Sequence, residues 1–210
     1  MSEFSIVLAS GSPRRRELLR NLGLDFVVLP AGADVEPSMH DYSSLEQAAR
    51  SVEASARAKA VAVARGLAKT AGPHLVIGAD TAVRFNRHML GKPHSEAEAR
   101  DMLRRLSGRW HCVLSGVCIC REGGGECRCA HAVTRVRFRP IGEEEIGAYV
   151  ATGLPLDKAG AYGIQDMASL FVEKIDGCYF NVMGLPLSVL DRLLKEFGFS
   201  ILSAAKQCRQ

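Results

Sequence analysis

The sequence predicts an α/β fold built on a mixed, twisted sheet with flanking helices. Short apolar runs alternate with amphipathic helical patterns through the first half of the chain, and a hairpin signal interrupts the second half. Hydrophobic residues make up 47% of the 210 residues, which is enough for a sizeable core. Neither an internal repeat nor a low-complexity linker divides the sequence, so we expect a single domain over residues 1–210.

The first elements are predicted to be a strand, a helix, a second strand and a long helix. Residues 4–9 form a short apolar run typical of a buried strand. A turn of small residues with Pro13 then leads into a helical pattern that ends at Gly23, and residues 26–29 form the second strand. Residues 43–66 are rich in alanine and place apolar side chains at steps of three and four, which predicts the long helix.

The later elements follow from the same kinds of pattern. Residues 75–83 are apolar almost throughout, as expected for a strand covered on both faces. Ser95 and Glu98 form a capping box that begins a helix. A run of glycines predicts a hairpin between two further strands. The remaining predictions are strands over 110–120, 127–138 and 170–175, and helices over 143–150 and 186–197.

Net charge and hydropathy limit the classes of partner. The net charge is +4 with scattered arginines, whereas nucleic-acid binders usually concentrate positive charge on one face. This mild balance fits a small anionic substrate and argues against nucleic acid as a partner. Because no apolar run reaches the ~18 residues of a membrane span, we expect no membrane partner. A strand-like run begins directly after Glu3 and leaves no room for a signal peptide, so we expect a cytoplasmic protein.

A candidate anion-binding turn lies between the first strand and the first helix. A helix N-terminus exposes backbone N–H groups and the positive end of its dipole, and Ser10, Gly11 and Ser12 let an anion approach the backbone closely. Arg14 and Arg15 add guanidinium groups that match phosphate oxygens. The alternative is a solvated basic turn, although positive charge at this position opposes the dipole unless an anion is bound.

Two charged residues interrupt apolar patterns. Asp80 lies inside the strand predicted for residues 75–83, where a carboxylate must be paired, bound to a metal or face a cleft at a strand end. Lys59 falls on the apolar stripe of the long helix. Each has an ordinary alternative, because an aspartate can cap a loop and a lysine can extend its amine to solvent from the edge of the stripe. For Lys59 the pattern by itself favours that alternative.

Two loops carry weaker signals. Lys92 precedes a proline, and such a residue can equally be an ordinary loop lysine. In residues 156–165, one glycine lies on each side of Tyr162, and Gln165 follows. This loop could close on a ligand, with Tyr162 packing against it and Gln165 forming hydrogen bonds, or it could be a glycine-rich connector. The spacing does not decide between these interpretations.

The cysteines suggest a competing idea. Seven is an odd number, and no small secreted framework contains them, so we expect free thiols. Cys118 and Cys120 precede the hairpin turn, and Cys127 and Cys129 follow it. Residues two apart on a strand point the same way, so four thiols could converge on a zinc ion. Structural zinc sites usually use Cys-x2-Cys to Cys-x4-Cys spacing, which makes zinc the less favoured alternative.

Five segments together resemble the Maf family of nucleoside triphosphate pyrophosphatases. They are LASGSPRRRELL, GADTAV, GKP, LDKAGAYGIQ and GLPL, which occur in family order over nearly the whole chain. The resemblance implies an α/β fold with a deep cleft between two lobes, similar to inosine triphosphate pyrophosphatases. It also implies hydrolysis of the α–β phosphoanhydride with a divalent metal cation (Mg, Mn or Co), and it allows a homodimer.

The resemblance also implies roles for single residues. The catalytic aspartate falls on Asp80, as base or metal ligand, and the motif lysines fall on Lys59 and Lys92. The phosphate-side residues are Ser10, Ser12, Arg14 and Arg15. The specificity positions of the branch that prefers dTTP and UTP are Arg14, Thr81 and Gln165. The family's acidic pair is split in this chain, so either Asp34 or Glu36 would join Asp80 as a metal ligand.

These expectations predict an enzyme that cuts dTTP or UTP into a monophosphate and pyrophosphate, without ranking the two, and so clears modified pyrimidines from the nucleotide pool. Gln165 can donate and accept hydrogen bonds at once, which suits the O4 and N3–H of uracil or thymine. A pocket closed by Tyr162 would exclude purines by shape. Two alternatives remain: the same chemistry on 7-methyl-GTP or inosine triphosphate, and a non-catalytic, nucleotide-binding regulator of cell division.

Overall fold

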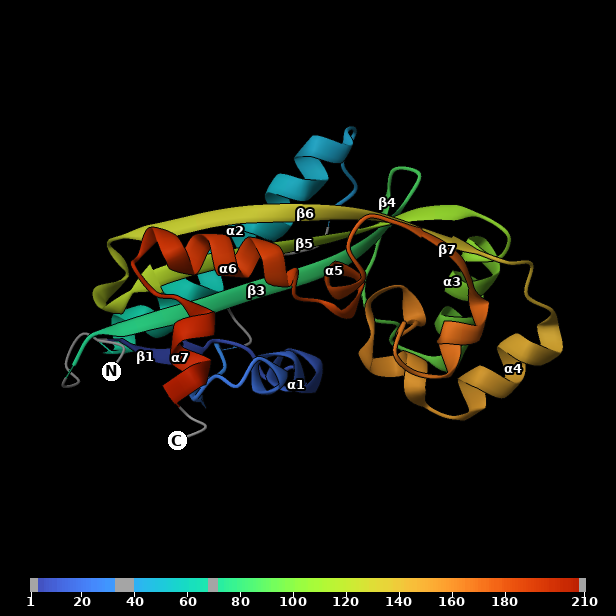
Figure 1. Ribbon diagram of the computed structural model, residues 1–210. Helices are drawn as coiled ribbons and strands as arrows, with labels where there is room; N and C mark the ends of the chain where they lie inside the picture. The colour runs from blue at the N-terminus through green and yellow to red at the C-terminus, as the bar shows by residue number, and fades with distance from the viewer. Residues whose placement is uncertain (1–3, 33–39, 68–71, 208–210) are drawn as a thin grey trace.

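A computed structural model describes residues 4–32, 40–67 and 72–207. Its centre is a seven-stranded sheet in the order β2-β1-β3-β5-β6-β7, with the short β4 paired to β3 (Figure 1). The β1 strand is parallel to β2 and β3, and every other pair is antiparallel. The strands are β1 (Ser5–Leu8), β2 (Phe26–Val28), β3 (His74–Phe85), β4 (His88–Leu90), β5 (Trp110–Arg121), β6 (Cys127–Phe138) and β7 (Val172–Asp176).

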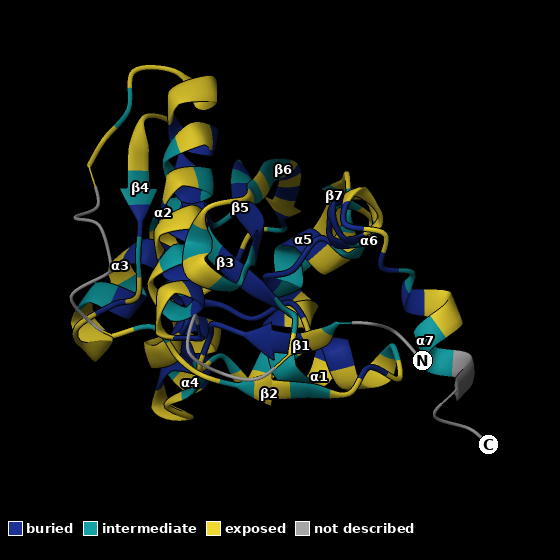
Figure 2. Ribbon diagram, turned by 90° about the vertical axis from the view of Figure 1, so that its left-hand side faces the viewer, coloured by how far each residue is buried: buried dark blue, intermediate teal, exposed yellow. Residues whose placement is uncertain are grey.

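Helices cover both faces of this sheet. The long α2 lies on one face, α1 and α6 lie on the other, and α3 and α4 pack together at the far end (Figure 1). Buried positions gather on the strands and on the helix sides that face them (Figure 2). The α-helices are α1 (Pro13–Asn21), α2 (Leu45–Gly66), α3 (Glu96–Leu106), α4 (Glu143–Ala151), α5 (Tyr179–Met183), α6 (Leu187–Glu196) and α7 (Ile201–Gln207). The 3₁₀ turns are η3 (Glu122–Gly124), η4 (Leu154–Asp157), η5 (Ala159–Ala161) and η6 (Met167–Phe171).

The predicted α/β class with a mixed sheet and flanking helices is confirmed. The strand β4, the helices α5 and α7 and the 3₁₀ turns were not predicted, because they are too short to produce a periodic pattern. It also began β7 too early, because Leu170 and Phe171 belong to the 3₁₀ turn before the strand. The helix predicted to be the last is followed by α7, after a break at Gly198 in the left-handed region (φ +76°). None of the described helices is long and apolar enough to cross a membrane.

Two glycines let α2 rest directly on the sheet. A β-carbon at Gly78 of β3 would lie 2.2 Å from the carbonyl oxygen of Ala56. A β-carbon at Gly116 of β5 would lie 2.2 Å from the carbonyl oxygen of Val52. Since real side chains do not approach backbone atoms this closely, both positions require glycine. The helix backbone is therefore held against β3, on the face toward which Asp80, two residues beyond Gly78, also points.

The opposite face of β3 divides its apolar residues between two cores. Residues up to Ala79 pack with α1 and α6, and residues from Val83 pack with α3 and α4. Thr81 lies between these cores, and its hydroxyl oxygen is 2.9 Å from that of Ser115 on β5. Ser115 in turn donates to the carbonyl oxygen of Asn181 at 3.2 Å. A short polar seam thus separates two apolar regions at the middle of the long strands.

Tyr162 belongs to the second core, and this corrects the expectation that it closes a pocket. Its ring stacks edge-on against Phe138 and His111, and its hydroxyl oxygen is 2.8 Å from Nε2 of His111. Only 6% of Tyr162 is exposed, so the ring is committed to packing. Burial lowers the pKa of His111 to about 3, well below the usual 6.5, because an imidazolium would lose its hydration there.

We expect His111 to make the fold acid-sensitive. In the unfolded chain His111 has the ordinary pKa of 6.5, whereas in the folded chain its pKa is about 3. Between these values the unfolded chain binds a proton that the folded chain does not, so the free energy of unfolding falls as the pH falls from about 6.5 to about 3. Between pH 7 and 5 this group alone should lower the free energy of unfolding by about 2 kcal/mol. Urea denaturation at pH 7 and pH 5 should show that the free energy of unfolding depends less on pH in a His111→Phe variant than in the parent protein. An equal change in the free energy of unfolding between the two pH values in both proteins would contradict the role given to His111.

The cysteine expectation is wrong for the β5–β6 hairpin. The structure joins Cys118 to Cys129 and Cys120 to Cys127 as disulfides. Each pair occupies directly opposite positions in the antiparallel ladder. Spacing along the chain gives no sign of this, because opposition across a hairpin depends on the register that its turn sets. Cys112 and Cys178 are the free cysteines within the described ranges.

Candidate active site

The edge of β3 is open over residues 79–82. The parallel pairing with β1 reaches only as far as Ile77, and the antiparallel pairing with β4 begins only at Val83. Ligands in open α/β sheets gather at the carboxyl ends of strands, and this gap lies directly past the carboxyl end of β1. The open edge contains Asp80 and Thr81, which the sequence analysis had selected as site residues.

The first turn of α1 borders this gap. Arg15 Nη1 donates to the carbonyl oxygen of Ala79 at 2.9 Å, which brings the start of the helix against β3. Ser12 is the N-cap residue, yet its side chain makes no capping hydrogen bond in the described structure. The Ser10 hydroxyl accepts a hydrogen bond from the Ser12 N–H at 3.3 Å. A helix start without a capping side chain or an acidic residue in its first turn is suited to an anionic ligand.

Arg15 connects three of the sequence motifs. Besides Ala79, its guanidinium donates to Ser10 Oγ at 3.0 Å, to the carbonyl oxygen of Gly184 at 2.9 Å and to Thr81 Oγ1 at 3.1 Å. Only 9% of this residue is exposed. The geometry therefore makes Arg15 a residue that orders the protein atoms of the site. Its predicted contact with phosphate stays a prediction.

Lys59 and Asp80 form a direct pair. Lys59 Nζ donates to Asp80 Oδ1 at 2.8 Å, and the side chains are 11% and 26% exposed. The pairing follows from the glycine contact, because Lys59 lies one turn beyond Ala56, and Asp80 lies two residues beyond Gly78. The alternative in which the amine of Lys59 reaches solvent is wrong for this structure. A half-buried carboxylate held by an ammonium group is suited to proton transfer or to ion binding.

Arg14 reaches across the gap toward the second core. Its Nη1 lies 3.2 Å from Oδ2 of Asp157 in η4, and both groups are partly exposed to solvent. A solvent-exposed ion pair of this kind contributes only ~0–1 kcal/mol, so substrate phosphates can replace the carboxylate as the partner of Arg14. The glycine-rich loop also contacts the Lys92 loop, because Gly160 N–H donates to Gly91 O at 2.9 Å. Lys92 itself is exposed.

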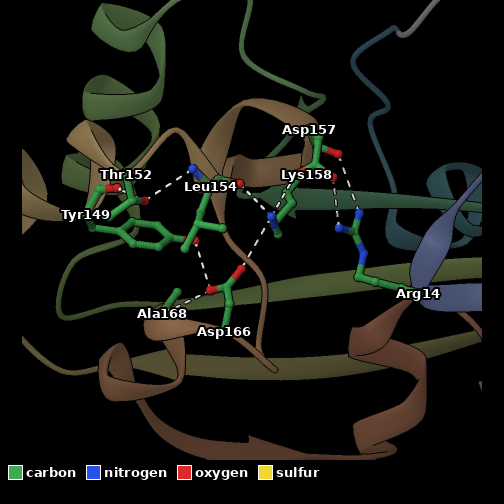
Figure 3. Close-up of polar contacts among 8 residues, drawn as sticks. All are labelled: Arg14, Tyr149, Thr152, Leu154, Asp157, Lys158, Asp166 and Ala168. Carbon is green, nitrogen blue, oxygen red and sulfur yellow. Dashed lines mark hydrogen bonds and ion pairs between the residues drawn. The ribbon is translucent and has the colours of Figure 1, made fainter. Parts of the chain in front are cut away.

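The glycine-rich loop is fastened by a buried lysine (Figure 3). Lys158 Nζ donates to the carbonyl oxygen of Leu154 at 2.5 Å and to Asp157 Oδ1 at 2.6 Å. It also lies 3.4 Å from Asp166 Oδ2, and Tyr149 donates its hydroxyl proton to Asp166 Oδ1 at 3.1 Å. Burial opposes ionisation of Asp157, but Lys158 and Arg14 outweigh it and hold the pKa of Asp157 below its usual value.

This network fixes the backbone next to Gln165. Asp166 follows Gln165 directly and also caps η6, because its Oδ1 accepts from the Ala168 N–H at 3.0 Å. Gln165 itself is exposed to solvent. Burial, reinforced by the Asp166 carboxylate, raises the pKa of Tyr149, which keeps this phenol protonated as a donor. Gln165 is thus an exposed amide on a loop whose neighbouring residues are held in place.

Lys158, Asp157 and Asp166 were not predicted as site residues. The available signal was three charged residues within a loop of otherwise small or apolar residues, which is the composition of a buried ion cluster. Ser115 and Asn181 gave no comparable signal. A serine inside an apolar strand is common, and the contact of Ser115 with Thr81 depends on the pairing of β3 with β5.

A divalent metal fits the chemistry of this site. Asp34 and Glu36 lie outside the described residues, so Asp80 is the predicted metal ligand that can be located. Lys59 engages Oδ1 of this carboxylate within the described part of the chain. Magnesium commonly binds through one or two carboxylates and completes its shell with water and substrate phosphates. One carboxylate beside the cations of this edge therefore suits an oxygen-preferring ion.

A surface pocket lies elsewhere and does not suit an anionic substrate. It has a volume of about 250 Å³ and is lined by Phe4, Ser5, Ile6, Leu24, Asp25, Phe26, Val27, Phe199 and Ala204. Its one charged lining residue among those described is Asp25, whose carboxylate would repel a polyphosphate. The charged and polar residues at the open edge of β3, and not the presence of a pocket, therefore identify that edge as the candidate site.

Comparisons with known proteins found relatives that match nearly the whole chain. The chain is 48% identical over 197 residues to a protein of Pelotomaculum thermopropionicum named "dTTP/UTP pyrophosphatase", covering 94% of this chain and 98% of the relative. Proteins with the same name from Moorella thermoacetica and Thermococcus kodakarensis are 51% and 47% identical. These matches cover 93% and 94% of this chain, and 96% and 99% of the relatives.

A solved structure and a family model were also matched. The structure of a HAM1 protein from Coxiella burnetii is similar with a TM-score of 0.47 at 18% identity, over 93% of this chain and 98% of that one. The family model described as "Maf-like protein" matches residues 5–197, a range that begins with β1 and ends just after α6. Because this match takes in all five motifs and every contact of the open edge, the chain belongs to the Maf-like protein family.

Proposed function

We propose that this protein is a nucleoside triphosphate pyrophosphatase that hydrolyses dTTP or UTP to the monophosphate and pyrophosphate. The observation that carries the proposal is the pairing of Lys59 with Asp80 at an open strand edge bordered by the basic first turn of α1. The relatives named "dTTP/UTP pyrophosphatase" at 47–51% identity support the same conclusion for the substrate. Such an activity would clear modified pyrimidines from the nucleotide pool.

The proposed chemistry is attack of water on the α-phosphorus. Asp80 accepts the proton of the attacking water, and Lys59 holds the carboxylate in place at 2.8 Å. The bond between the α-phosphorus and the bridging oxygen breaks, and pyrophosphate leaves. A triphosphate carries about four negative charges, so catalysis depends mainly on clustered cations. Arg14 and Lys92 would supply the cations, and the α1 start with Ser10 and Ser12 would supply donors.

A divalent cation would neutralise phosphate charge in this scheme and align the reacting oxygens. Asp80 would be its ligand, joined by Asp34 or Glu36. The residues of this chain perform the remaining tasks, which are binding, orientation and proton transfer. The choice among Mg, Mn and Co, the predicted homodimer and the cytoplasmic location all remain predictions.

Base selection in this proposal depends on Gln165 and not on Tyr162. The amide of Gln165 can donate to O4 and accept from N3–H of uracil or thymine. Since Tyr162 is committed to the core, exclusion of purines has to come from the loop backbone that Lys158 and Asp166 hold in place. The proposal thus assigns recognition of the pyrimidine edge to the exposed amide of Gln165, and exclusion of purines to the fixed backbone of its loop.

A substrate panel tests the proposal. The purified chain should be assayed with Mg²⁺, Mn²⁺ and Co²⁺ against the common nucleoside triphosphates, 7-methyl-GTP and inosine triphosphate. We expect dTTP and UTP to exceed every purine in kcat/KM by at least ~10-fold, a ratio within reach of a site that hydrogen-bonds the base. The products should be a monophosphate and pyrophosphate, and EDTA should abolish turnover.

Two outcomes would contradict different parts of the proposal. Nucleotide binding without pyrophosphate release under any metal would reject the enzyme and favour a binding regulator. A purine preferred by at least ~10-fold would leave the enzyme standing and reject the role given to Gln165.

A further inference from the structure

The β5–β6 hairpin gathers four sulfur atoms on one face of the sheet. Cys118 lies directly opposite Cys129, and Cys120 lies directly opposite Cys127. Residues two apart on a strand point to the same side, so all four side chains project toward α2. The Maf-like activity proposed above makes no use of these residues.

The four sulfur atoms lie close together in two bonded pairs, and the distance between the pairs is near that of a metal site. Sγ of Cys118 lies 3.9 Å from Sγ of Cys120, and both lie within 4.8 Å of Sγ of Cys127. The fourth sulfur, that of Cys129, is bonded to Cys118. Four thiolates bound tetrahedrally at 2.3 Å from zinc stand ~3.8 Å apart. To reach this geometry, the S–S bond of each pair must be reduced and its two sulfur atoms must move apart.

The surroundings favour a soft cation over other ligands. Cys118 and Cys120 are fully buried against Ala60 and Ala64 of α2, in an apolar cluster that also contains Val76. An all-thiolate donor set without a carboxylate selects soft ions such as Zn²⁺ over Mg²⁺. The cysteines beyond the turn, Cys127 and Cys129, are half-buried, which leaves a path for an ion to enter.

The turn of the hairpin lies beside a positive charge. A β-carbon at Gly124 would lie 3.4 Å from Cγ of Arg65, so this arginine stem on α2 borders the turn. The Cys-x-Cys spacing also suits strands, whose alternation places the first and third residues on one face.

We infer that the thiol form of this hairpin is a structural site for one Zn²⁺ or a similarly soft cation, bound by Cys118, Cys120, Cys127 and Cys129. A newly made chain contains thiols, and ion binding releases their protons to solvent. The disulfide form arises from the same four residues when an oxidant removes two electrons and two protons per pair. The bound ion would fasten β5 and β6 beneath α2, the helix that carries Lys59.

The test uses the full chain reduced with a phosphine and titrated with Co²⁺ and Zn²⁺ without oxygen. We expect one Zn²⁺ per chain that survives excess Mg²⁺, and a Co²⁺ form with the thiolate charge-transfer and ligand-field bands of a four-coordinate site. Cys118→Ser should weaken Zn²⁺ binding by more than ~10-fold, since losing even a residue that only hydrogen-bonds a metal ligand weakens binding by ~10- to 100-fold. The matched control is Cys112→Ser with Cys178→Ser, which should bind as the unchanged chain does.

Counting reactive thiols in the unchanged protein gives a second measurement that needs no variant. Zn²⁺ should protect four thiols from alkylation and raise the melting temperature. Absence of tight Zn²⁺ uptake would overturn the inference. A Co²⁺ spectrum that is identical in Cys118→Ser would overturn it as well. None of these outcomes bears on pyrophosphate release, so the proposed enzyme function stands or falls separately.

Discussion

Replacement of Asp80 by asparagine should lower turnover of dTTP and UTP by at least ~100-fold, the usual scale for losing a general base. The amide has the shape of the carboxylate and can still accept from Lys59, so the 2.8 Å contact should survive in neutral form. It cannot take the proton of the attacking water or contribute negative charge to a cation. The measurement is pyrophosphate release under saturating metal, with kcat and KM determined separately.

A control variant separates this effect from a general loss of charge. Asp176 at the end of β7 is 63% exposed and pairs with Arg135 at 3.6 Å, far along the sheet from the open edge of β3. Asp176→Asn should leave pyrophosphate release unchanged. The free energy of unfolding of both variants should lie within about 1 kcal/mol of that of the parent protein. Full activity in Asp80→Asn would reject the mechanism.

Combining Asp80→Asn with Lys59→Met tests whether the two residues act as a unit. Groups that serve one step are non-additive, so the double variant should be only slightly slower than the slower single variant. Fully additive losses would mean that the two side chains act at separate steps, in spite of their contact.

The sequence was sufficient to predict those parts of the fold that depend on local patterns. The end of α2 at Gly66 and the turn between β5 and β6 follow from periodicity and glycine, and both are confirmed. The helix begins at Leu45, two residues later than predicted, because Ser44 is its N-cap. The charge at Asp80 was conspicuous because its strand is otherwise apolar. Lys59 was harder to interpret, since only the approach of α2 to Gly78 determines whether its amine meets solvent or a carboxylate.

What the sequence could not predict depends on register and on distant contacts. Tyr162 was expected at a ligand, yet its place against His111 and Phe138 follows from how the glycine-rich loop packs on β5 and β6. Arg15 was expected at phosphate, and its hydrogen bonds to Ala79, Thr81 and Gly184 join segments far apart in the chain. Such contacts arise only when several elements are assembled, so local patterns contain no record of them.

Gly78→Ala should be the most disruptive single methyl group in this site. The new β-carbon would lie 2.2 Å from the carbonyl oxygen of Ala56 and 2.8 Å from the backbone nitrogen of Ala60. These are backbone atoms of α2, so relief requires the helix itself to move away from β3. Overpacking of this kind typically lowers the free energy of unfolding by ~1–3 kcal/mol, which urea denaturation would measure.

Movement of α2 should also reduce activity in the fraction of Gly78→Ala that remains folded. Lys59 would withdraw from Asp80, and a displacement of ~1 Å in a catalytic group can cost ~100-fold in rate. Gly66→Ala is the matched control, because a β-carbon there meets nothing within 4 Å and alanine favours the helix. It should be neutral or slightly stabilising, with unchanged turnover. If Gly78→Ala had the same stability and turnover as Gly66→Ala, the close packing of α2 on β3 could not be what brings Lys59 to Asp80.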